Sequence, residues 1–335
     1  MKYLKLPFMC CFLAYSCSGL EPIIIVHGGA GDIDDSRIQG KLDGVRVAAR
    51  EGYEVLRQGG SALDAVEAAV VSMEKDEYFN AGYGSVLNIK GEIEMEASIM
   101  RGSDLNVGAV TLVKDFPHPI SIAHKVLTDS PHSLLGGEGA KTFAIEKGFE
   151  TVPQDSLITN YAMESLYDYL HQYEYKKSEA EPLTATGIRP KYEGGVGTVG
   201  AVAVDVQGNI ASATSTGGLT GKAVGRMGDV PMIGSGTYAD DLIGGVSSTG
   251  HGESILKYCL AHTIIKLIEQ GVDANNATKH AINAMTTRLN NTAGAITLSK
   301  KGDVGIYFSS QRMAWAYIQN NKVFYGIERD EILED

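Results

Sequence analysis

Cysteine is scarce outside the first residues of this sequence. Three of the four cysteines, Cys10, Cys11 and Cys17, lie near the N-terminus, and Cys259 is the only other one. A single cysteine cannot form an intramolecular disulfide, so the chain beyond residue 19 has no disulfide framework. At 335 residues and 44% hydrophobic content, the chain can bury most of its apolar surface without one.

The N-terminal apolar run is too short to cross a bilayer. It spans Leu6–Tyr15, follows Lys2 and Lys5, and precedes the small residues Ser16–Gly19. A run of about ten residues is half of what a membrane span needs, but this layout is typical of a secretory signal peptide. We expect residues 1–19 to be one; the alternatives are a non-functional extension or a start codon assigned too far upstream. The first reading favours the secretory pathway, the others the cytoplasm.

Positive charge is also in deficit, with 29 Lys and Arg against 41 Asp and Glu and a net charge of −12. An acidic chain repels phosphate backbones, so we expect no nucleic-acid partner. The glycine-rich turn His27–Gly31 is not followed by a Gly-Lys-Ser/Thr or dinucleotide fingerprint, which excludes a nucleotide-binding interpretation. The sequence contains no redox-cofactor or zinc motif either, and we expect no cofactor for catalysis.

Glycine, by contrast, is abundant, at 40 of 335 residues. The glycines lack a repeat period and sit in short clusters, as expected where the backbone turns tightly or approaches a ligand. Hydrophobic patterning predicts strands near residues 23–26, 85–89, 93–99, 108–113, 198–205, 210–214, 295–299, 303–308 and 323–327. It predicts helices near 42–56, 120–128, 140–147 and 253–270, and one capped by Ser61 with Asp64. Strands flanked by helices suggest a layered α+β fold.

One segment breaks this pattern. Residues 172–197 are polar, with little apolar periodicity, and we expect a linker there, since long loops within a domain are usually functional or disordered. The linker ends at Gly197, and Thr198 opens the next predicted strand. A structural reading of a Gly-Thr pair would ordinarily suffice, because threonine favours strands anyway.

The position of Thr198 also permits a specific chemistry. A threonine hydroxyl is a weak nucleophile that needs a neighbouring base. If the Gly197–Thr198 bond is cut, the new α-amino group of Thr198, with an ordinary pKa of about 7.7–8.0, becomes that base. The hydroxyl can make the cut itself by attacking the Gly197 carbonyl, and glycine adds no side chain to hinder the strained geometry.

The segment Gly197–Asp205 (GTVGAVAVD) resembles the cleavage motif of plant-type asparaginases, also called isoaspartyl peptidases. Further blocks resemble this family in order and spacing over nearly the whole chain from Ile23. They are His27–Gly31 (HGGAG), Phe79–Ser85 (FNAGYGS), Ala213–Gly218 (ATSTGG), Gly225–Asp229 (GRMGD) and Ser248–Glu253 (STGHGE). Val196 departs from the polar residue often found two before the threonine, and we expect cleavage to survive this change.

The resemblance assigns roles to individual residues. Thr198 is the implied nucleophile, Thr216 orients it, and Thr249 and Asn80 face the oxyanion. Arg226 would bind the substrate α-carboxylate and Asp229 the α-ammonium, although a surface ion pair is the plain alternative. The implied substrate-binding set is Arg226, Met227, Gly228, Asp229, Thr249, Gly250, His251 and Gly252. We expect His27 to be structural and His251 to be a neighbour of the reaction.

The resemblance also implies a structural sodium loop within Met73–Tyr83, held mainly by backbone carbonyls. Its matching positions are Met73, Glu74, Asp76, Phe79, Ala81 and Tyr83. From the residues alone, a helix end without an ion is an equal alternative.

The family implies a single-domain, four-layer αββα sandwich of the N-terminal-nucleophile hydrolases over residues 20–335. It implies an α chain ending at Gly197, a β chain from Thr198, and pairing of two such units. The expected reaction is hydrolysis of L-asparagine and β-aspartyl dipeptides. Rival interpretations are a glycosylasparaginase, a threonine endopeptidase of the same superfamily, or a non-catalytic secreted binding protein. The block Gly197–Gly200 (GTVG) differs from the Asp-Thr-Ile-Gly of glycosylasparaginases, so the glycosylasparaginase interpretation ranks below the isoaspartyl peptidase one.

Overall fold

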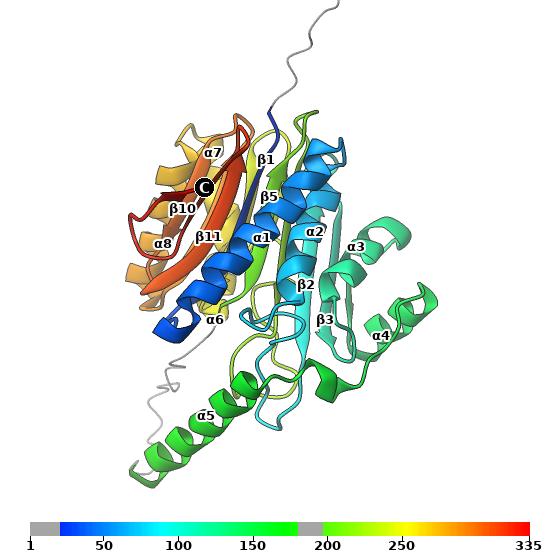
Figure 1. The fold of residues 1–335 in the computed structure, drawn as a ribbon, viewed down its shortest axis with the longest axis vertical. Helices are drawn as coiled ribbons and strands as arrows, with labels where there is room; N and C mark the ends of the chain where they lie inside the picture. The colour runs from blue at the N-terminus through cyan, green and yellow to red at the C-terminus, as the bar shows by residue number, and fades with distance from the viewer. Residues whose placement is uncertain (1–20, 180–196) are drawn as a thin grey trace, which may run out of the picture.

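The computed structural model describes residues 21–179 and 197–335 and has a mixed α/β fold built on two sheets (Figure 1). The expected signal peptide therefore lies outside the described residues. The larger sheet has the order β13-β12-β11-β1-β5-β6-β2-β3-β4, and the smaller has the order β10-β9-β8-β7. The strands of the larger sheet are β1 (Ile23–Gly31), β2 (Met95–Arg101), β3 (Val107–Val113), β4 (Leu134–Gly136), β5 (Val199–Val204), β6 (Ile210–Thr216), β11 (Arg312–Gln319), β12 (Lys322–Gly326) and β13 (Leu333–Glu334). Those of the smaller sheet are β7 (Thr237–Asp240), β8 (Gly244–Gly250), β9 (Ala293–Ser299) and β10 (Val304–Phe308).

Helices cover the sheets. Their bounds are α1 (Ile38–Arg57), α2 (Ala62–Glu74), α3 (Pro119–Asp129), α4 (Gly137–Glu146), α5 (Asn160–Glu179), α6 (Gly252–Tyr258), α7 (Leu260–Glu269) and α8 (Ala274–Leu289). Helices α1, α2 and α3 pack on the larger sheet, and α7 and α8 pack on the smaller one. The two sheets contact each other through β1, β5 and β6 against β8 and β9. In Figure 1, α1 and α2 cross the larger sheet, and α5 projects from the body.

The strands at the centre of the larger sheet are buried on both faces. Strands β5 and β1 pair antiparallel, as do β5 and β6, and every residue of Val199–Val204 is buried. One face of this centre contributes to the core under α1 and α2, and the other to the core between the sheets. This explains the continuous small and β-branched sequence of β5, which has no polar face to present.

Most of the predicted elements are confirmed in place. The cap of α2 is confirmed too, because the Ser61 hydroxyl accepts the Asp64 amide at 3.1 Å. The predicted strand 85–89 is wrong: that segment is a loop with an isolated bridge at Asn88, since Gly82 and Gly84 adopt positive φ and turn the chain away.

Three further boundaries are corrected. The strand expected to end before His27 continues as β1 to Gly31 through an irregular pairing between His27 and Ala30. The helix expected over 253–270 divides into α6 and α7, because Cys259 between them adopts a left-handed φ of 50°. The linker expected from residue 172 is wrong at its start, since α5 extends to Glu179; the remainder of that prediction, 180–196, lies outside the described residues.

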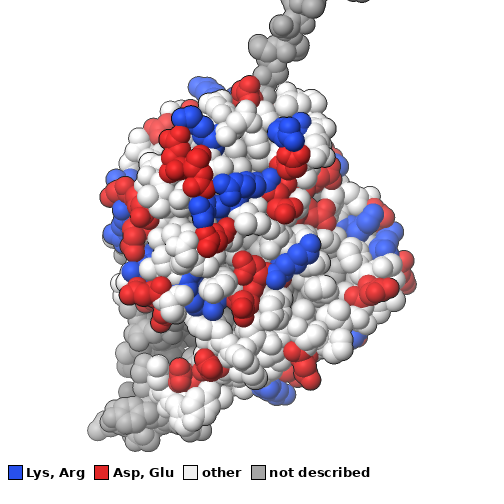
Figure 2. All heavy atoms as spheres, in the orientation of Figure 1, with Lys and Arg blue, Asp and Glu red and all other residues white. Residues whose placement is uncertain are grey.

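The surface carries charged side chains of both signs, as the composition predicts. Figure 2 shows acidic and basic side chains intermixed over the face that carries α1 and α2. At this face Arg46 and Arg50 of α1 both contact Asp335, which fixes the C-terminal residue on the helix. Among helices of residues 21–179 and 197–335, none combines the length and apolarity that a transmembrane span requires.

The packing of α3 on β3 gives a test of the fold. A Cβ at Gly108 would lie 1.9 Å from the Ala123 carbonyl oxygen, which is backbone and cannot move aside. We expect Gly108→Ala to lower the free energy of unfolding by about 1–3 kcal/mol, as overpacking does. Denaturant unfolding measures this, with Gly139→Ala as the matched control. Gly139 lies in α4 with nothing within 4 Å of the added carbon, so that change should be neutral or stabilising by up to about 1 kcal/mol. Equal stability of the two variants would contradict the packing described here.

Candidate active site

Thr198 lies at the start of β5, in the middle of the larger sheet, and only 7% of it is exposed. The β5–β6 register pairs Val199 with Ser215. One step further along this antiparallel pair places Thr198 opposite Thr216, which ends β6. The sheet therefore brings together two threonines that are 18 residues apart in sequence.

The scissile peptide predicted at Gly197 rests against an irregular turn of β1. Gly29 there has φ of +100°, a conformation that favours glycine. A Cβ at Gly29 would lie 2.5 Å from both the carbonyl carbon and the carbonyl oxygen of Gly197. In the reverse direction, a Cβ at Gly197 would lie 2.4 Å from the Ala30 nitrogen. Both glycines are therefore required for two backbones to approach this closely.

This turn is tied to the second sheet. The Ala30 amide donates to the Thr249 hydroxyl at 3.1 Å, and the His27 ring nitrogen Nε2 lies 2.9 Å from the Ser247 hydroxyl. A Cβ at Gly200, the second glycine of the GTVG block, would lie 2.0 Å from the Ser247 hydroxyl. The absence of a side chain there leaves room for the contact between Ser247 and His27. The sheets thus meet at the predicted nucleophile, and Thr249 is placed within the same cluster.

His27 is unsuited to act as a general base. It is fully buried, and its pKa is lowered from 6.5 to about 3, chiefly by this burial; the Thr198 backbone acts in the opposite direction, and the Lys41 charge adds to the lowering. A group with so low a pKa has little capacity to take a proton near neutral pH. This geometry agrees with the structural role expected for His27.

Asn80 and Thr216 meet at the turn after β6. The Asn80 side-chain amide donates to the Gly218 carbonyl at 2.8 Å, and its side-chain oxygen accepts the Val86 amide at 3.0 Å. The Thr216 hydroxyl accepts the Gly218 amide at 2.9 Å. The structure therefore places both predicted residues against one turn, beside the position of Thr198.

Arg226 has a partner that the sequence interpretation did not name. Its Nε and Nη2 each lie 3.0 Å from one carboxylate oxygen of Glu253, so the pair is bidentate. The side chain of Arg226 is only 13% exposed and Asp229 is buried, so these two residues do not form the surface ion pair considered above. One edge of the guanidinium is occupied in this way, and a second carboxylate would have to approach Nη1.

Asp229, unlike Arg226, is a buried charged residue that lacks a full set of hydrogen-bond partners. It is 4% exposed, and its Oδ2 has no hydrogen-bond partner among the described residues. Burial raises its pKa to about 7, against the opposing charge of Arg226. A buried, unsatisfied carboxylate is costly and commonly marks a functional site.

The remaining predicted binding residues surround this pair. A Cβ at Gly252 would lie 2.6 Å from Arg226 Nη2 and 2.9 Å from Asp229 Oδ1, and one at Gly228 would lie 2.9 Å from Arg226 Nη1. A side chain at either glycine would therefore collide with these charged groups. Met227 is 43% exposed, and Gly250 has φ of +126° at the end of β8.

His251 acts as a helix cap here. Its Nδ1 lies 2.9 Å from the Ser254 hydroxyl and accepts the Ser254 amide at 3.3 Å, at the start of α6. Burial lowers its pKa. This placement agrees with the expectation that His251 lies beside the reacting groups and takes no part in the reaction.

The predicted sodium loop follows α2 and closes on itself. The Glu74 carbonyl accepts the Tyr83 amide at 2.8 Å, and the Asp76 carbonyl accepts the Phe79 amide at 3.1 Å. The Glu74 carboxylate turns inward and accepts the Ser215 hydroxyl at 2.6 Å. No three His, Cys, Asp or Glu side chains gather as a metal site within the described residues. Any cation would therefore depend on carbonyl oxygens, which retain a second lone pair after accepting one hydrogen bond.

The sequence interpretation did not identify several buried charged residues around the site. Lys222 Nζ donates to the Glu94 carbonyl at 2.6 Å, and Glu96 accepts the Gly228 amide at 3.0 Å. Lys41 Nζ donates to the Gly28 carbonyl at 2.9 Å. Lysine and glutamate are rarely fully buried, so only packing could identify them; Glu253 had the one local signal, its place in the STGHGE block.

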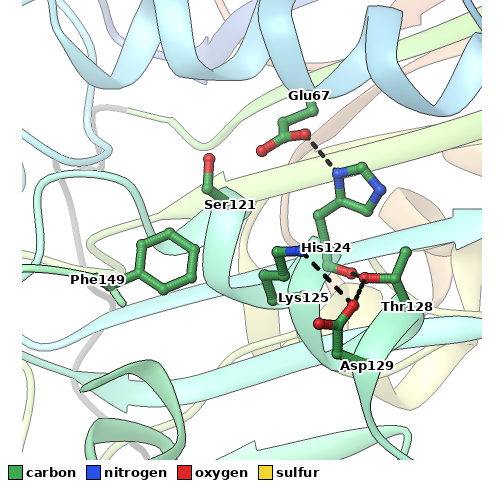
Figure 3. Close-up of a pocket in the computed structure, with 7 residues that line it drawn as sticks. All are labelled: Glu67, Ser121, His124, Lys125, Thr128, Asp129 and Phe149. Atoms are coloured by element: carbon green, nitrogen blue, oxygen red, sulfur yellow. Dashed lines mark hydrogen bonds and ion pairs between the residues drawn. The ribbon is translucent and has the colours of Figure 1, made fainter. Parts of the chain in front are cut away.

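A separate pocket of about 500 Å³ lies beside α2 and α3 (Figure 3). Its lining comprises Glu67, Ser121, His124, Lys125, Thr128, Asp129 and Phe149. Its polar groups satisfy one another: His124 contacts Glu67, and Thr128 donates to Asp129 at 2.6 Å. None of the predicted site residues lines it, so it is distinct from the cluster at Thr198.

Comparisons with known proteins show the family of this chain. A protein named probable isoaspartyl peptidase/L-asparaginase from Drosophila melanogaster is 48% identical over 92% of this chain and 96% of its own length. The isoaspartyl peptidase/L-asparaginase of Xenopus laevis is 45% identical over 93% and 97%, and that of Homo sapiens is 44% identical over 93% and 98%. The sequence profile described as asparaginase matches residues 20–327. The chain belongs to the asparaginase family.

Proposed function

We propose that this chain is an isoaspartyl peptidase and L-asparaginase that uses Thr198 as its nucleophile. The observation that carries the proposal is the position of Thr198 beside Thr216, with Gly197 pressed on Gly29 and the Arg226–Asp229 pair nearby in the same site. The names of the relatives support the substrate class. The reaction is hydrolysis of a side-chain amide.

Maturation is the first step. The Thr198 hydroxyl attacks the Gly197 carbonyl carbon, the C–N bond breaks, and the hydroxyl proton passes to the departing nitrogen. Water then hydrolyses the resulting ester, which leaves a carboxylate on Gly197 and a free hydroxyl and α-amino group on Thr198. Glycine at residue 197 and Gly29 opposite it support this step, since any side chain at either position would push the carbonyl away.

Catalysis then uses the new α-amino group. That amine takes the proton of the Thr198 hydroxyl, which attacks the side-chain carbonyl of the substrate. Thr249 and Asn80 stabilise the oxyanion. Collapse expels ammonia from asparagine, or an amino acid from a β-aspartyl dipeptide, and water releases aspartate from the ester.

Substrate recognition rests on Arg226 and Asp229. Arg226 binds the α-carboxylate through Nη1, because Glu253 occupies the Nε edge. Asp229 binds the α-ammonium with the oxygen that lacks a partner. Met227, Gly228, Gly250, His251 and Gly252 shape the surrounding wall. Both accepted substrates present a free aspartyl backbone, which these two charges distinguish from an internal peptide residue.

The alternative within this superfamily is glycosylasparagine hydrolysis. The GTVG block and the names of the relatives favour β-aspartyl dipeptides. Comparing turnover of a glycosylated asparagine with that of a β-aspartyl dipeptide separates the two, and faster release from the glycosylated compound would reject our assignment.

The finer architecture is also a proposal. The layering of α1–α3, two sheets and α7–α8 supports a single-domain four-layer αββα sandwich over residues 20–335. Two αβ units pair, as the family implies. Light scattering of the mature protein tests the pairing, and a mass of one αβ unit would reject it.

We further propose that the Met73–Tyr83 loop holds a structural sodium ion through its carbonyls. The closure between Glu74 and Tyr83 supports this, and Asn80 lies in the same loop. The bound ion would add rigidity there. Replacing sodium by a bulky organic cation should lower the melting temperature of the wild-type protein, and an unchanged value would remove the ion from the proposal.

Thr198 gives the most direct test. We expect Thr198→Ala to remain one uncut chain on a denaturing gel and to lose activity by several orders of magnitude, because it has neither hydroxyl nor freed amine. Thr198→Ser retains the hydroxyl and should be cut, more slowly. Thr128→Ala, on the surface of α3, is the control and should behave as wild type. Full β-aspartyl hydrolysis by Thr198→Ala would overturn the mechanism.

Asp229 gives a pH test free of the chemical step. Because burial raises its pKa to about 7, the carboxylate is protonated below that pH and cannot pair with an ammonium. We expect the inhibition constant of the product L-aspartate to rise about tenfold per pH unit below about pH 7. Succinate, which lacks the ammonium, is the matched ligand and should bind no more weakly as the pH falls. Parallel pH profiles for the two inhibitors would rule out this role for Asp229.

A further inference from the structure

Lys41 is a fully buried lysine that the proposed mechanism does not use. It lies on α1 with no exposed surface, and its Nζ donates to the Gly28 carbonyl at 2.9 Å. It makes no ion pair with a carboxylate within 4.0 Å among the described residues. Burying an ammonium without an ion pair is costly, so its presence calls for a function that an apolar side chain would not serve.

The surroundings of Lys41 hold the ammonium in one place. Its Nζ lies 4.9 Å from the centre of the Phe79 ring. Burial, with the charge of Arg37, lowers its pKa to about 7, and the charge of Asp76 acts in the opposite direction. The amine keeps hydrogens to donate in either protonation state.

The carbonyl that Lys41 binds belongs to the turn against the scissile bond. His27 is held by Ser247, and Ala30 by Thr249, both from β8 in the second sheet. Lys41 of α1 holds a third residue of the turn, Gly28, from the opposite side. The turn is therefore anchored at three of its four residues, and the fourth, Gly29, is the one that contacts the Gly197 carbonyl.

We propose that Lys41 is a positioning residue for chain cleavage: by fixing the Gly28 carbonyl it keeps Gly29 pressed against the Gly197 carbonyl that Thr198 attacks. The inference rests on the proposed maturation step. Without this anchor, the Gly28–Gly29 peptide rotates more freely, and the Gly197 carbonyl moves out of line with the hydroxyl. The side chain touches neither the substrate nor the reacting atoms, so it acts only through this backbone.

The role predicts a separation between cleavage and substrate binding. Arg226 pairs with Glu253, and the Gly228 amide next to Asp229 donates to Glu96; among the described residues neither glutamate makes an ion pair with Lys41. A variant at Lys41 should therefore process slowly, yet bind L-aspartate normally once it is cut. A general loss of structure would weaken both properties together.

The experiment measures conversion of the full chain to two bands on a denaturing gel over time. We expect Lys41→Met, which has similar length and no donor, to convert at least tenfold more slowly than wild type. Lys41→Arg retains a donor and should restore part of the rate. Arg50→Met removes a cation from the exposed side of the same helix, where it contacts Asp335, and should convert at the wild-type rate.

Thermal unfolding of each uncut chain and the inhibition constant of L-aspartate for each cut enzyme complete the test. Equal conversion of Lys41→Met and wild type would overturn the proposal, as would slowing by Arg50→Met to the same degree. If Lys41→Met does not fold, a Lys41→Leu chain, which also lacks a donor, has the same meaning if it folds and converts at the wild-type rate. A wild-type chain that is never cut would reject the proposed maturation itself, a distinct result.

Discussion

The arrangement of this site depends on one close backbone contact, between Gly29 of β1 and the carbonyl of Gly197. No side chain fits between them, so the two strands approach as only glycines allow. The turn that carries Gly29 is fastened to β8 by His27 and Ala30 and to α1 by Lys41. Because these anchors come from the smaller sheet and a helix while the turn itself belongs to the larger sheet, the position of the proposed scissile carbonyl is a property of the whole fold.

The same sheets separate two kinds of chemistry. At Thr198 the groups are neutral and small, and the buried His27 has a pKa of about 3, so in the proposed mechanism the α-amino group of Thr198 is the base. At Arg226 the groups are charged: Arg226 pairs with Glu253, and burial raises the pKa of Asp229 to about 7. In the proposed mechanism, bond cleavage and recognition of the aspartyl backbone therefore rely on different physical interactions in one site.

Family blocks in the sequence located most of this site because their glycines and threonines are strung along the chain in a fixed order. Thr198, Thr216, Asn80, Arg226 and Asp229 were all predicted there, and the structure places them on converging strand ends and turns. The buried partners were not predictable in the same way. Lys41, Glu96 and Lys222 look like ordinary surface residues in sequence, and only their depth reveals them.

The amino-acid sequence alone determined the family and most strand and helix positions, and it led to the proposal of Thr198 as the nucleophile, because hydrophobic period and glycine placement are local properties. It did not determine where β1 ends, the break at Cys259 or the helical extent of α5, since positive φ and strand pairing depend on distant neighbours. Tertiary structure alone decided which partner each of these charged side chains binds: Arg226 pairs with Glu253, and Lys41 donates to the Gly28 carbonyl. Contacts between residues far apart in the chain are fixed by packing, for which no local pattern exists.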